Sequence, residues 1–426
     1  MSGLTDSVPK KGPFNRVESH AAISKAPFSL YIHIPFCAHK CPYCDFNTYA
    51  VGAKLPERDY VAALRAELDF RAAQPEWHGR SIATIFLGGG SPSLLSPSAL
   101  TELFQTISQL FSIQEDAEVS LEANPNDTSL PWLAAIREMG INRLSIGAQT
   151  FQNHLLPKLG RNHSSSQIRN AVGDARMAGF SNISIDLMFG IPEQTVPDFA
   201  SDLNAAIDLS TDHLSLYGLT IEAGTPFFQA SKRGILKLPP DEATLEMMEL
   251  AETVLARAGL IRYEISNYAR PGFEALHNIA YWTRADYLGV GAGAHSFWGG
   301  AQEQSQPSFG RRWSNLAPFS SYMEHASAFG KAESWEEILT LESQIFEQFF
   351  LRLRMVQGLD ASTWPLRFGF SLAERYVKEL TQFEREGLMI WDRENARIAM
   401  TPRGFALFDS IVECFIPDEK GSQKGL

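Results

Sequence analysis

The sequence predicts an α/β protein, whose main part is a parallel sheet covered by helices and whose C-terminal part is a smaller α+β unit. Two observations carry this prediction. Short apolar strands alternate with amphipathic helices over the first half of the chain, and the pattern changes near Glu333. Such alternation is typical of parallel sheets with helices outside. With 426 residues, of which 44% are hydrophobic and 20% charged, the chain can form more than one core.

Six strand–helix steps are expected in the main part. Apolar or alternating runs predict strands at 29–35, 84–87, 118–122, 143–147, 182–188 and 213–217. Apolar residues at three- and four-residue spacing predict helices between them, at 56–73, 98–111, 130–139, 166–178 and 197–209.

The C-terminal part predicts a winged-helix-like α+β module. Its expected elements are helices at 342–353 and 371–386, a hairpin formed by 387–391 and 396–400, and a closing helix at 401–414. Such modules often bind DNA, but residues 336–414 hold more acidic than basic side chains, the opposite of a phosphate-binding face. We interpret the module as a lid or partner surface, and Cys414 as a buried structural thiol.

Composition limits the class of protein further. A net charge of −12 argues against a nucleic-acid partner, and no apolar run approaches the roughly 20 residues of a transmembrane segment. Three of the four cysteines cluster, which suits a reducing, cytoplasmic compartment. We expect a main α/β domain at 26–265, a linking segment at 266–332 and a C-terminal domain at 333–416. Tails are expected at both ends, at 1–25 and 417–426.

The clustered cysteines, Cys37, Cys41 and Cys44, have the spacing C-x3-C-x2-C directly after the first expected strand. Thiolates are soft ligands, suited to iron–sulfur clusters and to zinc. A [4Fe–4S] cluster has four irons, so three thiolates leave one iron open to a small molecule. Zinc would need a fourth ligand, from His33, His39 or Asp45. Ligand softness favours the cluster.

Polar, glycine- and proline-bearing segments follow the other expected strands. They are 88–92 (Gly-Gly-Gly-Ser-Pro), 122–125, 147–150, 186–192 and 217–220. In α/β barrels this end of the strands is the face that binds ligands. Taken singly, each segment is more often a turn or a solvated surface.

In order, the cysteine loop and these strand ends resemble the radical S-adenosylmethionine (SAM) family. The resemblance implies a partial (β/α)6 barrel, a [4Fe–4S] cluster on Cys37, Cys41 and Cys44, and SAM on the open iron. The positions that match contacts with SAM or a second ligand are Tyr31, Tyr43, Gly89, Gly90, Ser91, Glu122, Gln149, Arg161 and Asp186.

A narrower resemblance is to oxygen-independent coproporphyrinogen III oxidases and their relatives, with a HemN-like C-terminal domain. The oxidases carry another cysteine two residues after the third, where this chain has Phe46. The segment from His277 to Trp282 reads H-N-x-x-Y-W, which is similar to the HemW-type haem chaperones.

The resemblance to these chaperones implies haem as cargo and client haemoproteins as partners, without coproporphyrinogen oxidase activity. Peripheral contact with membrane-bound clients is compatible with it. His277 would be the iron ligand, and Tyr281 and Trp282 would stack on the porphyrin. Two alternatives stay open: the motif braces a loop, or the protein is an oxidase that decarboxylates coproporphyrinogen III.

A lone G-x-G-x-x-A pattern occurs at 289–294. A dinucleotide site would need a buried strand before it, and residues 284–287 make a poor one. We interpret these glycines instead as a close backbone approach beside the barrel.

Overall fold

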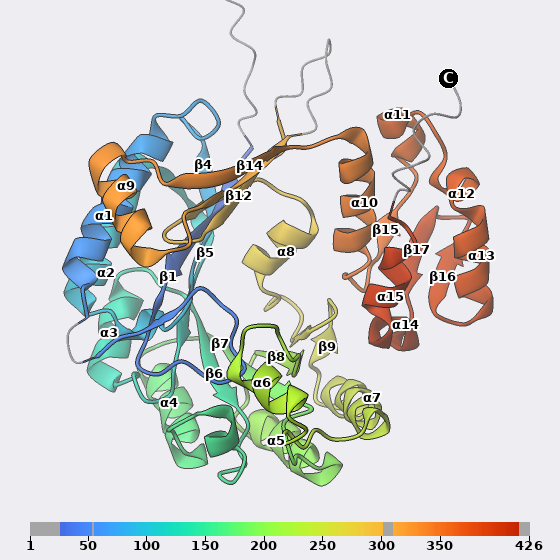
Figure 1. Cartoon of the computed structure of the whole chain (residues 1–426), viewed down its shortest axis with the longest axis horizontal. Helices are drawn as coiled ribbons and strands as arrows, with labels where there is room; N and C mark the ends of the chain where they lie inside the picture. Colours follow the sequence, from blue (N-terminus) through green and yellow to red (C-terminus); the bar gives the residue numbers. More distant parts are fainter. Residues whose placement is uncertain (1–25, 53–54, 301–309, 417–426) are drawn as a thin grey trace, which may run out of the picture.

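A computed structural model describes residues 26–52, 55–300 and 310–416 of the chain (Figure 1). The tails expected at 1–25 and 417–426 lie outside these residues. Within the described ranges, no helix is long and apolar enough to cross a membrane.

The main domain is built on six parallel strands that lie side by side in chain order, as the sequence predicts. They are β1 (Phe28–Ile34), β4 (Ser81–Gly89), β5 (Ser112–Ala123), β6 (Arg143–Gln149), β7 (Asn182–Phe189) and β8 (His213–Gly218). Because both faces are covered, their residues are almost continuously buried, as in β1 and β6. The predicted α/β fold with a six-stranded parallel arc is therefore confirmed.

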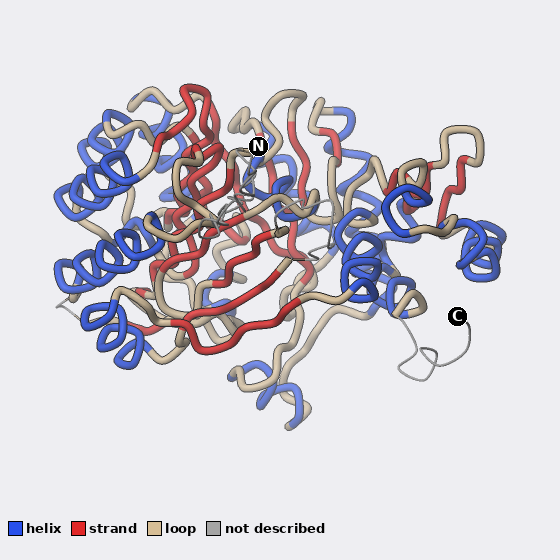
Figure 2. The backbone as a smooth tube through the Cα atoms, turned by 90° about the horizontal axis from the view of Figure 1, so that it is seen from above, coloured by secondary structure: helices blue, strands red, loops and turns tan. Residues whose placement is uncertain are grey.

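Helices cover the outside of this arc (Figure 1). They are α1 (Glu57–Ala72), α2 (Pro97–Leu110), α3 (Leu130–Glu138), α4 (Ser165–Met177), α5 (Val196–Asp208) and α7 (Asp241–Arg257). Seen from above, the strands form one curved layer with most of these helices along its outer side (Figure 2). Two 3-10 turns, at Pro92–Leu94 and Leu156–Leu159, and the projecting helix α6 (Pro226–Lys232) lie in the connections.

The sheet continues beyond both ends of the arc to twelve strands. Next to β1 lie β11 (Tyr287–Val290), β12 (His295–Trp298), β13 (Arg311–Asn315) and β14 (Glu333–Ile338); next to β8 lie β10 (Asn267–Ala269) and β9 (Ile261–Arg262). Residues 266–332 were expected to link two domains, and in the structure they supply strands to the main sheet instead. The apolar residues Leu288 and Val290 of β11 are fully buried where they pair with β1.

Helix α8 (Leu276–Trp282) lies inside the open arc, between the strands and the C-terminal domain (Figure 1). Helix α9 (Phe319–Phe329) packs on α1, where the ring of Phe319 meets those of Tyr60 and Phe36. The inside of the arc is thus partly filled, and the remaining space is bounded by α8, the cysteine loop and strands β11–β13.

The C-terminal domain has its own core around Phe349, Trp364 and Phe415. Its helices are α10 (Leu341–Arg352), α11 (Trp364–Phe368), α12 (Leu372–Arg375), α13 (Val377–Arg385), α14 (Pro402–Ala406) and α15 (Phe408–Glu413). Its strands β15 (Leu359–Asp360), β17 (Arg397–Met400) and β16 (Met389–Asp392) form a small sheet in that order, which includes the expected hairpin.

Three details of the C-terminal expectation differ. The helices expected at 371–386 and 401–414 are each divided, because Tyr376 and Leu407 leave helical geometry with φ near −116° and −115°. Cys414 is exposed rather than buried. The boundary expected at 333 falls within the main sheet, because β14 pairs with β13 and the C-terminal core begins only with α10.

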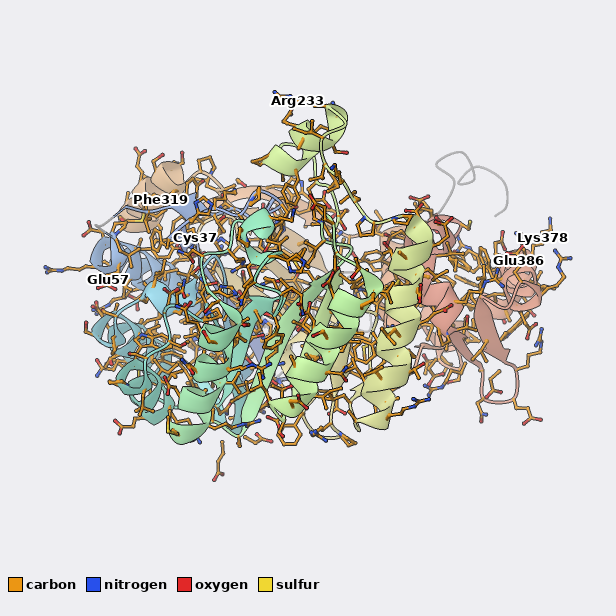
Figure 3. The ribbon with its side chains drawn as sticks, turned by 90° about the horizontal axis from the view of Figure 1, so that it is seen from below. Cys37, Glu57, Arg233, Phe319, Lys378 and Glu386 are labelled. Carbon is orange, nitrogen blue, oxygen red and sulfur yellow. The ribbon has the colours of Figure 1, made fainter. Side chains whose placement is uncertain are left out.

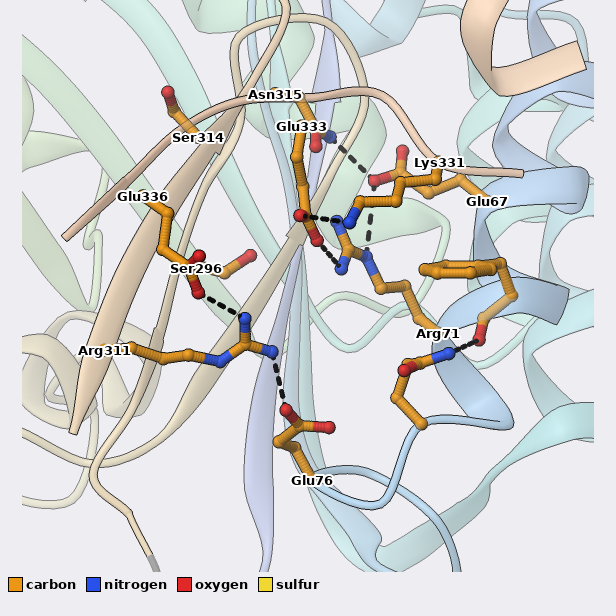
Figure 4. Close-up of polar contacts among 12 residues, drawn as sticks. Glu67, Arg71, Glu76, Ser296, Arg311, Ser314, Asn315, Lys331, Glu333 and Glu336 are labelled. Atoms are coloured by element: carbon orange, nitrogen blue, oxygen red, sulfur yellow. Dashed lines mark hydrogen bonds and ion pairs between the residues drawn. The ribbon is translucent and has the colours of Figure 1, made fainter. Parts of the chain in front are cut away.

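A buried network joins α1 to the added strands (Figure 4). The carboxylate of Glu67 accepts hydrogen bonds from Gly291 N (3.0 Å), Asn315 Nδ2 (2.7 Å) and Tyr322 Oη (2.8 Å). Arg71, one turn along, forms an ion pair with Glu333 at 2.5 Å. These contacts hold the turn between β11 and β12 against the helical layer.

That turn contains the glycine pattern at 289–294. A Cβ on Gly291, whose φ is +104°, would lie 2.7 Å from both the His33 carbonyl oxygen and the Tyr60 hydroxyl. A Cβ on Gly293 would lie 2.8 Å from the amide of Asn47. The expected close backbone approach is confirmed.

Replacing Glu67 by alanine should destabilise the main domain by about 3 kcal/mol or more, because buried donors on Gly291, Asn315 and Tyr322 would lose their acceptor. Urea unfolding followed by tryptophan fluorescence measures this loss. Glu324→Ala on the exposed face of α9 is the control, and it should change the unfolding free energy by less than about 0.5 kcal/mol. Equal losses in the two variants would show that the network does not stabilise the fold.

Candidate functional site: a cysteine loop beside an aromatic cavity

The cysteine loop follows β1 and is closed by a short parallel pair of strands, β2 (Phe36–Cys37) and β3 (Tyr49–Ala50). Lys40 donates from Nζ to the carbonyl oxygens of Phe46 (3.0 Å) and Thr48 (3.3 Å), which fixes the loop across its width. Figure 3 shows Cys37 close to Phe319, on the side of the molecule from which α6 projects near Arg233.

The three thiols of this loop fit the donor set of a cluster. Cys37, Cys41 and Cys44 are partly exposed and free of disulfides. Burial raises the pKa of Cys37, and the charges of Cys44 and Cys41 raise it further, so the three sulfurs are electrostatic neighbours. Over the described ranges, no three His, Cys, Asp or Glu side chains are gathered tightly enough for a single metal ion. A [4Fe–4S] cluster does not need its ligands to converge on one ion, because each thiolate binds a separate iron.

The glycine run at the end of β4 lies directly against this loop. Gly90 N donates to the Ile34 carbonyl (2.8 Å), and Ser91 N donates to that of Phe36 (2.7 Å). Gly89 has φ +106°, and a Cβ there would overlap the ring of His33. The His33 ring therefore occupies the space beside Gly89 that a side chain would need. The Gly89 N–H points to Glu122 Oε2 at 3.0 Å.

Glu122, near the end of β5, is a partly buried carboxyl group with an unusual pKa. Burial and the negative charge of Asp186 raise that pKa to about 7. Burial also raises the pKa of Asp186, which accepts a hydrogen bond from Ser145 Oγ at 2.9 Å. Two carboxyl groups, Glu122 near the end of β5 and Asp186 within β7, therefore interact electrostatically, and Glu122 changes charge near neutral pH.

A polar chain connects the cysteine loop to the ends of β4 and β5. Arg161 donates to Tyr43 Oη (2.9 Å) and to Asn124 Oδ1 (2.8 Å). Asn124 in turn donates from Nδ2 to Ser91 Oγ at 2.6 Å. Three residues that the sequence picked out separately, Tyr43, Ser91 and Arg161, are thus brought together. Asn124 was recognised only as part of a strand end.

Gln149, at the end of β6, has φ +66°, a conformation that non-glycine residues rarely adopt. Its side chain is buried near Gly147 and Arg161, since a Cβ on Gly147 would lie 3.0 Å from Gln149 Nε2 and 3.9 Å from Arg161 Nη1. Backbone strain of this kind concentrates at functional sites. Gln149 therefore belongs to the same cluster of polar strand ends.

On β1, the Tyr31 hydroxyl hydrogen-bonds with His33 Nδ1 (3.0 Å), and His33 Nε2 with the Asn47 carbonyl (2.9 Å). Both ring nitrogens of His33 are therefore engaged, and the ring serves to connect β1 to the cysteine loop. The sequence argument considered His33 only as a fourth zinc ligand.

His277 lies on α8 and is buried, with 1% of its surface exposed. Its Nδ1 is 2.7 Å from Thr84 Oγ1 and its Nε2 is 2.9 Å from Tyr281 Oη. Its ring also stacks on Phe86. Burial lowers its pKa to about 3. Both nitrogens are thus engaged within the fold. This differs from the iron ligand expected from the sequence, and it is what the alternative interpretation of the motif, as a structural brace, predicts.

A cavity of about 660 Å³ opens between the strand ends, α8 and α10. This volume lies within the roughly 300–1,000 Å³ of typical ligand sites. Its wall combines three of the predicted SAM positions, Tyr31, Gly89 and Glu122, with a second, aromatic side. The lining residues are Tyr31, His33, Phe46, Asn47, Gly89, Glu122, Tyr281, Trp282, Arg284, Tyr287, Gly293, Ala294, His295, Phe297, Arg312, Ala317, Glu347 and Leu351.

Apart from Tyr281 and Trp282, the residues of the aromatic side of the cavity were not predicted from the sequence. Tyr287, Phe297 and Arg312 face one another because they are cross-strand neighbours on β11, β12 and β13. Such pairings join residues from separate strands, so only the strand register reveals them. His295 had one signal, since it directly follows the glycine pattern.

Comparison with known proteins agrees with this architecture. Residues 31–206 match the radical SAM superfamily, and residues 339–407 match the HemN C-terminal domain. The solved structure titled coproporphyrinogen III oxidase (HemN) from Escherichia coli, a radical SAM enzyme, superposes with a TM-score of 0.78 at 26% identity. The alignment covers 93% of this chain and 92% of that one. Fold and site thus define a radical SAM protein.

Among curated relatives, the heme chaperone HemW of Lactococcus lactis is 36% identical over 92% of this chain and 98% of that protein. HemW of Bacillus subtilis is 37% identical over 91% of this chain and 99% of that protein. The chain belongs to the HemW family.

Proposed function

We propose that this protein is a cytoplasmic haem chaperone, which binds haem and delivers it to client haemoproteins. The observation that carries the proposal is the cavity, whose aromatic side adjoins the cysteine loop. Phe46 lines this cavity and is 63% exposed, at the position where the resemblance places an extra cysteine in the oxidases. The names of the HemW relatives support the same cargo.

The proposal includes a [4Fe–4S] cluster on Cys37, Cys41 and Cys44. When bound, it would supply one iron that has no protein ligand. SAM would bind there, with the Gly89 and Gly90 backbone and Glu122 toward its amino group. The polar chain of Tyr43, Ser91 and Arg161 would hold the loop in position, and Tyr31, Gln149 and Asp186 would complete the polar wall.

One alternative rests on a specific observation. The superposition on the E. coli coproporphyrinogen III oxidase covers nearly the whole chain, including the C-terminal domain. An oxidase would use the same SAM site, so that site does not separate the two functions. Phe46 in place of a cysteine favours the chaperone.

The pH dependence of SAM binding should report Glu122. Its carboxyl group accepts a stronger, charge-assisted hydrogen bond from the SAM amino group when it is ionised, which requires a pH above its pKa of about 7. SAM affinity, measured by calorimetry on the cluster-containing protein, should therefore rise from about pH 6 to about pH 8. Glu122→Gln removes this ionisation and should bind SAM more weakly with a flatter pH profile. If SAM affinity changed with pH in the same way in the wild type and in Glu122→Gln, Glu122 would not be the group that titrates.

Haem titration beside an enzyme assay separates the two functions. The anaerobic, cluster-containing chain should bind about one haem, by the size of a single cofactor cavity, with a shifted Soret band. It should not decarboxylate coproporphyrinogen III with SAM and a reductant, in an assay validated with a known oxidase. Turnover by this chain would replace the chaperone with the oxidase, and absence of haem binding would reject the chaperone.

A further inference from the structure

Two histidines, His33 and His295, line the cavity, and only His295 has an available imidazole. His33 is buried with both nitrogens engaged. His277, whose nitrogens are also engaged, is not part of the lining although its neighbours Tyr281 and Trp282 are. Across the part of the chain that the structure describes, no hydrogen-bond or ion-pair partner is found for the ring of His295, which is an exposed residue.

Strand geometry directs His295 toward the aromatic side of the cavity. His295 and Phe297 alternate with the buried Ser296 along β12, so they share one face. Phe297 pairs with Tyr287 on β11 and with Arg312 on β13, which places these side chains on the same face. Tyr281 of α8 contacts Tyr287 edge-on, with 4.6 Å between the ring centroids, and Trp282 of the same helix and Leu351 of α10 also line the cavity.

The backbone that carries His295 is rigidly held. Gly289 N donates to Ser296 Oγ at 2.9 Å, and Asn315 N donates to the Ala294 carbonyl at 2.9 Å. The Glu67 network fixes Gly291 from behind. Because this backbone is held in place, the His295 side chain keeps its position. A residue that binds a cofactor requires such a fixed position.

The surroundings of His295 favour a neutral ring. Although the residue is exposed to the cavity, the protein partly shields its ring from water, which lowers its pKa, and the positive charge of Arg312 lowers it further. The other charged groups on this side are Arg284, whose guanidinium lies over the Phe297 ring, and Glu347, which pairs with both arginines. A neutral imidazole has a free nitrogen lone pair, which is the form that binds haem iron.

We propose that His295, rather than His277, is the protein ligand of the haem iron, in the cavity between β11–β13 and α8. This inference rests on the proposed haem binding. Aromatic side chains that line the cavity, Tyr287 of β11 and Tyr281 and Trp282 of α8, would contact the apolar macrocycle. His277 then positions α8, through its hydrogen bonds to Thr84 and Tyr281.

The test is a titration of hemin into the full-length, cluster-containing chain. His295→Ala should weaken haem binding by on the order of tenfold or more, since even the outer partners of metal ligands are worth ten- to hundredfold in affinity. Added free imidazole should restore the wild-type Soret band in this variant. His325→Ala is the matched control, because His325 is an exposed imidazole on α9 that does not line the cavity. It should bind haem like the wild type.

A second variant keeps the test decisive if His295→Ala folds poorly. His295→Cys should give ferric haem the spectrum of a thiolate-ligated iron, which a merely structural role for His295 would not produce. Circular dichroism and iron content should match the wild type in both variants.

The outcomes distinguish this inference from the proposed function. If the wild type binds haem but both His295 variants keep its affinity and spectrum, the ligand assignment is overturned while the chaperone proposal stands. If the haem Soret band were lost in His277→Ala but kept in the His295 variants, His277 would be the iron ligand. If the wild type binds no haem, both proposals fail.

Discussion

The buried carboxylate of Glu67 is the contact on which the cavity depends. It accepts hydrogen bonds from Gly291, Asn315 and Tyr322, and so joins the helical layer to the strands added beside β1. Without it, several buried donors would be unpaired in the same place. Because the turn at 289–294 is held there, its backbone lies against His33 and Tyr60. The side of the cavity formed by β11 and β12 is therefore fixed in position relative to the cysteine loop.

The other side is fixed by α8, which lies inside the arc. Glu118 accepts hydrogen bonds from the backbone of Leu276 (2.9 Å) and His277 (3.1 Å) at the start of this helix, where a negative charge is favourable. The His277 ring then joins α8 to β4 through Thr84. These contacts place Tyr281 and Trp282 opposite β11–β13, so that one cavity connects Glu122 and Gly89 with His295. A bound group on the aromatic side would thus lie next to the proposed SAM site.

Much of this could be predicted from the sequence. The six parallel strands and the positions of Gly89, Glu122 and Arg161 at their ends follow from local patterns and chain order. The added strands could not be predicted in the same way, because β11 and β12 are short and are specified by contacts with β1 rather than by periodicity. For the same reason, residues 266–332 were expected to be a link. The environment of His277 was also inaccessible, because its partner Thr84 lies 193 residues away. A motif shows which side chains are present, but not which of their atoms are already engaged.

The central claim is that three thiolates leave one cluster iron open beside this cavity. The most direct measurement is electron paramagnetic resonance of the anaerobically purified, reduced protein, with and without SAM, beside iron and sulfide analysis. We expect about four irons and four sulfides per chain, and a spectrum that SAM changes. Cys37→Ser, Cys41→Ser and Cys44→Ser should each abolish the cluster, whereas Cys414→Ser, in the C-terminal domain, should not. Stoichiometric zinc without sulfide, or a spectrum unchanged at saturating SAM, would contradict the account.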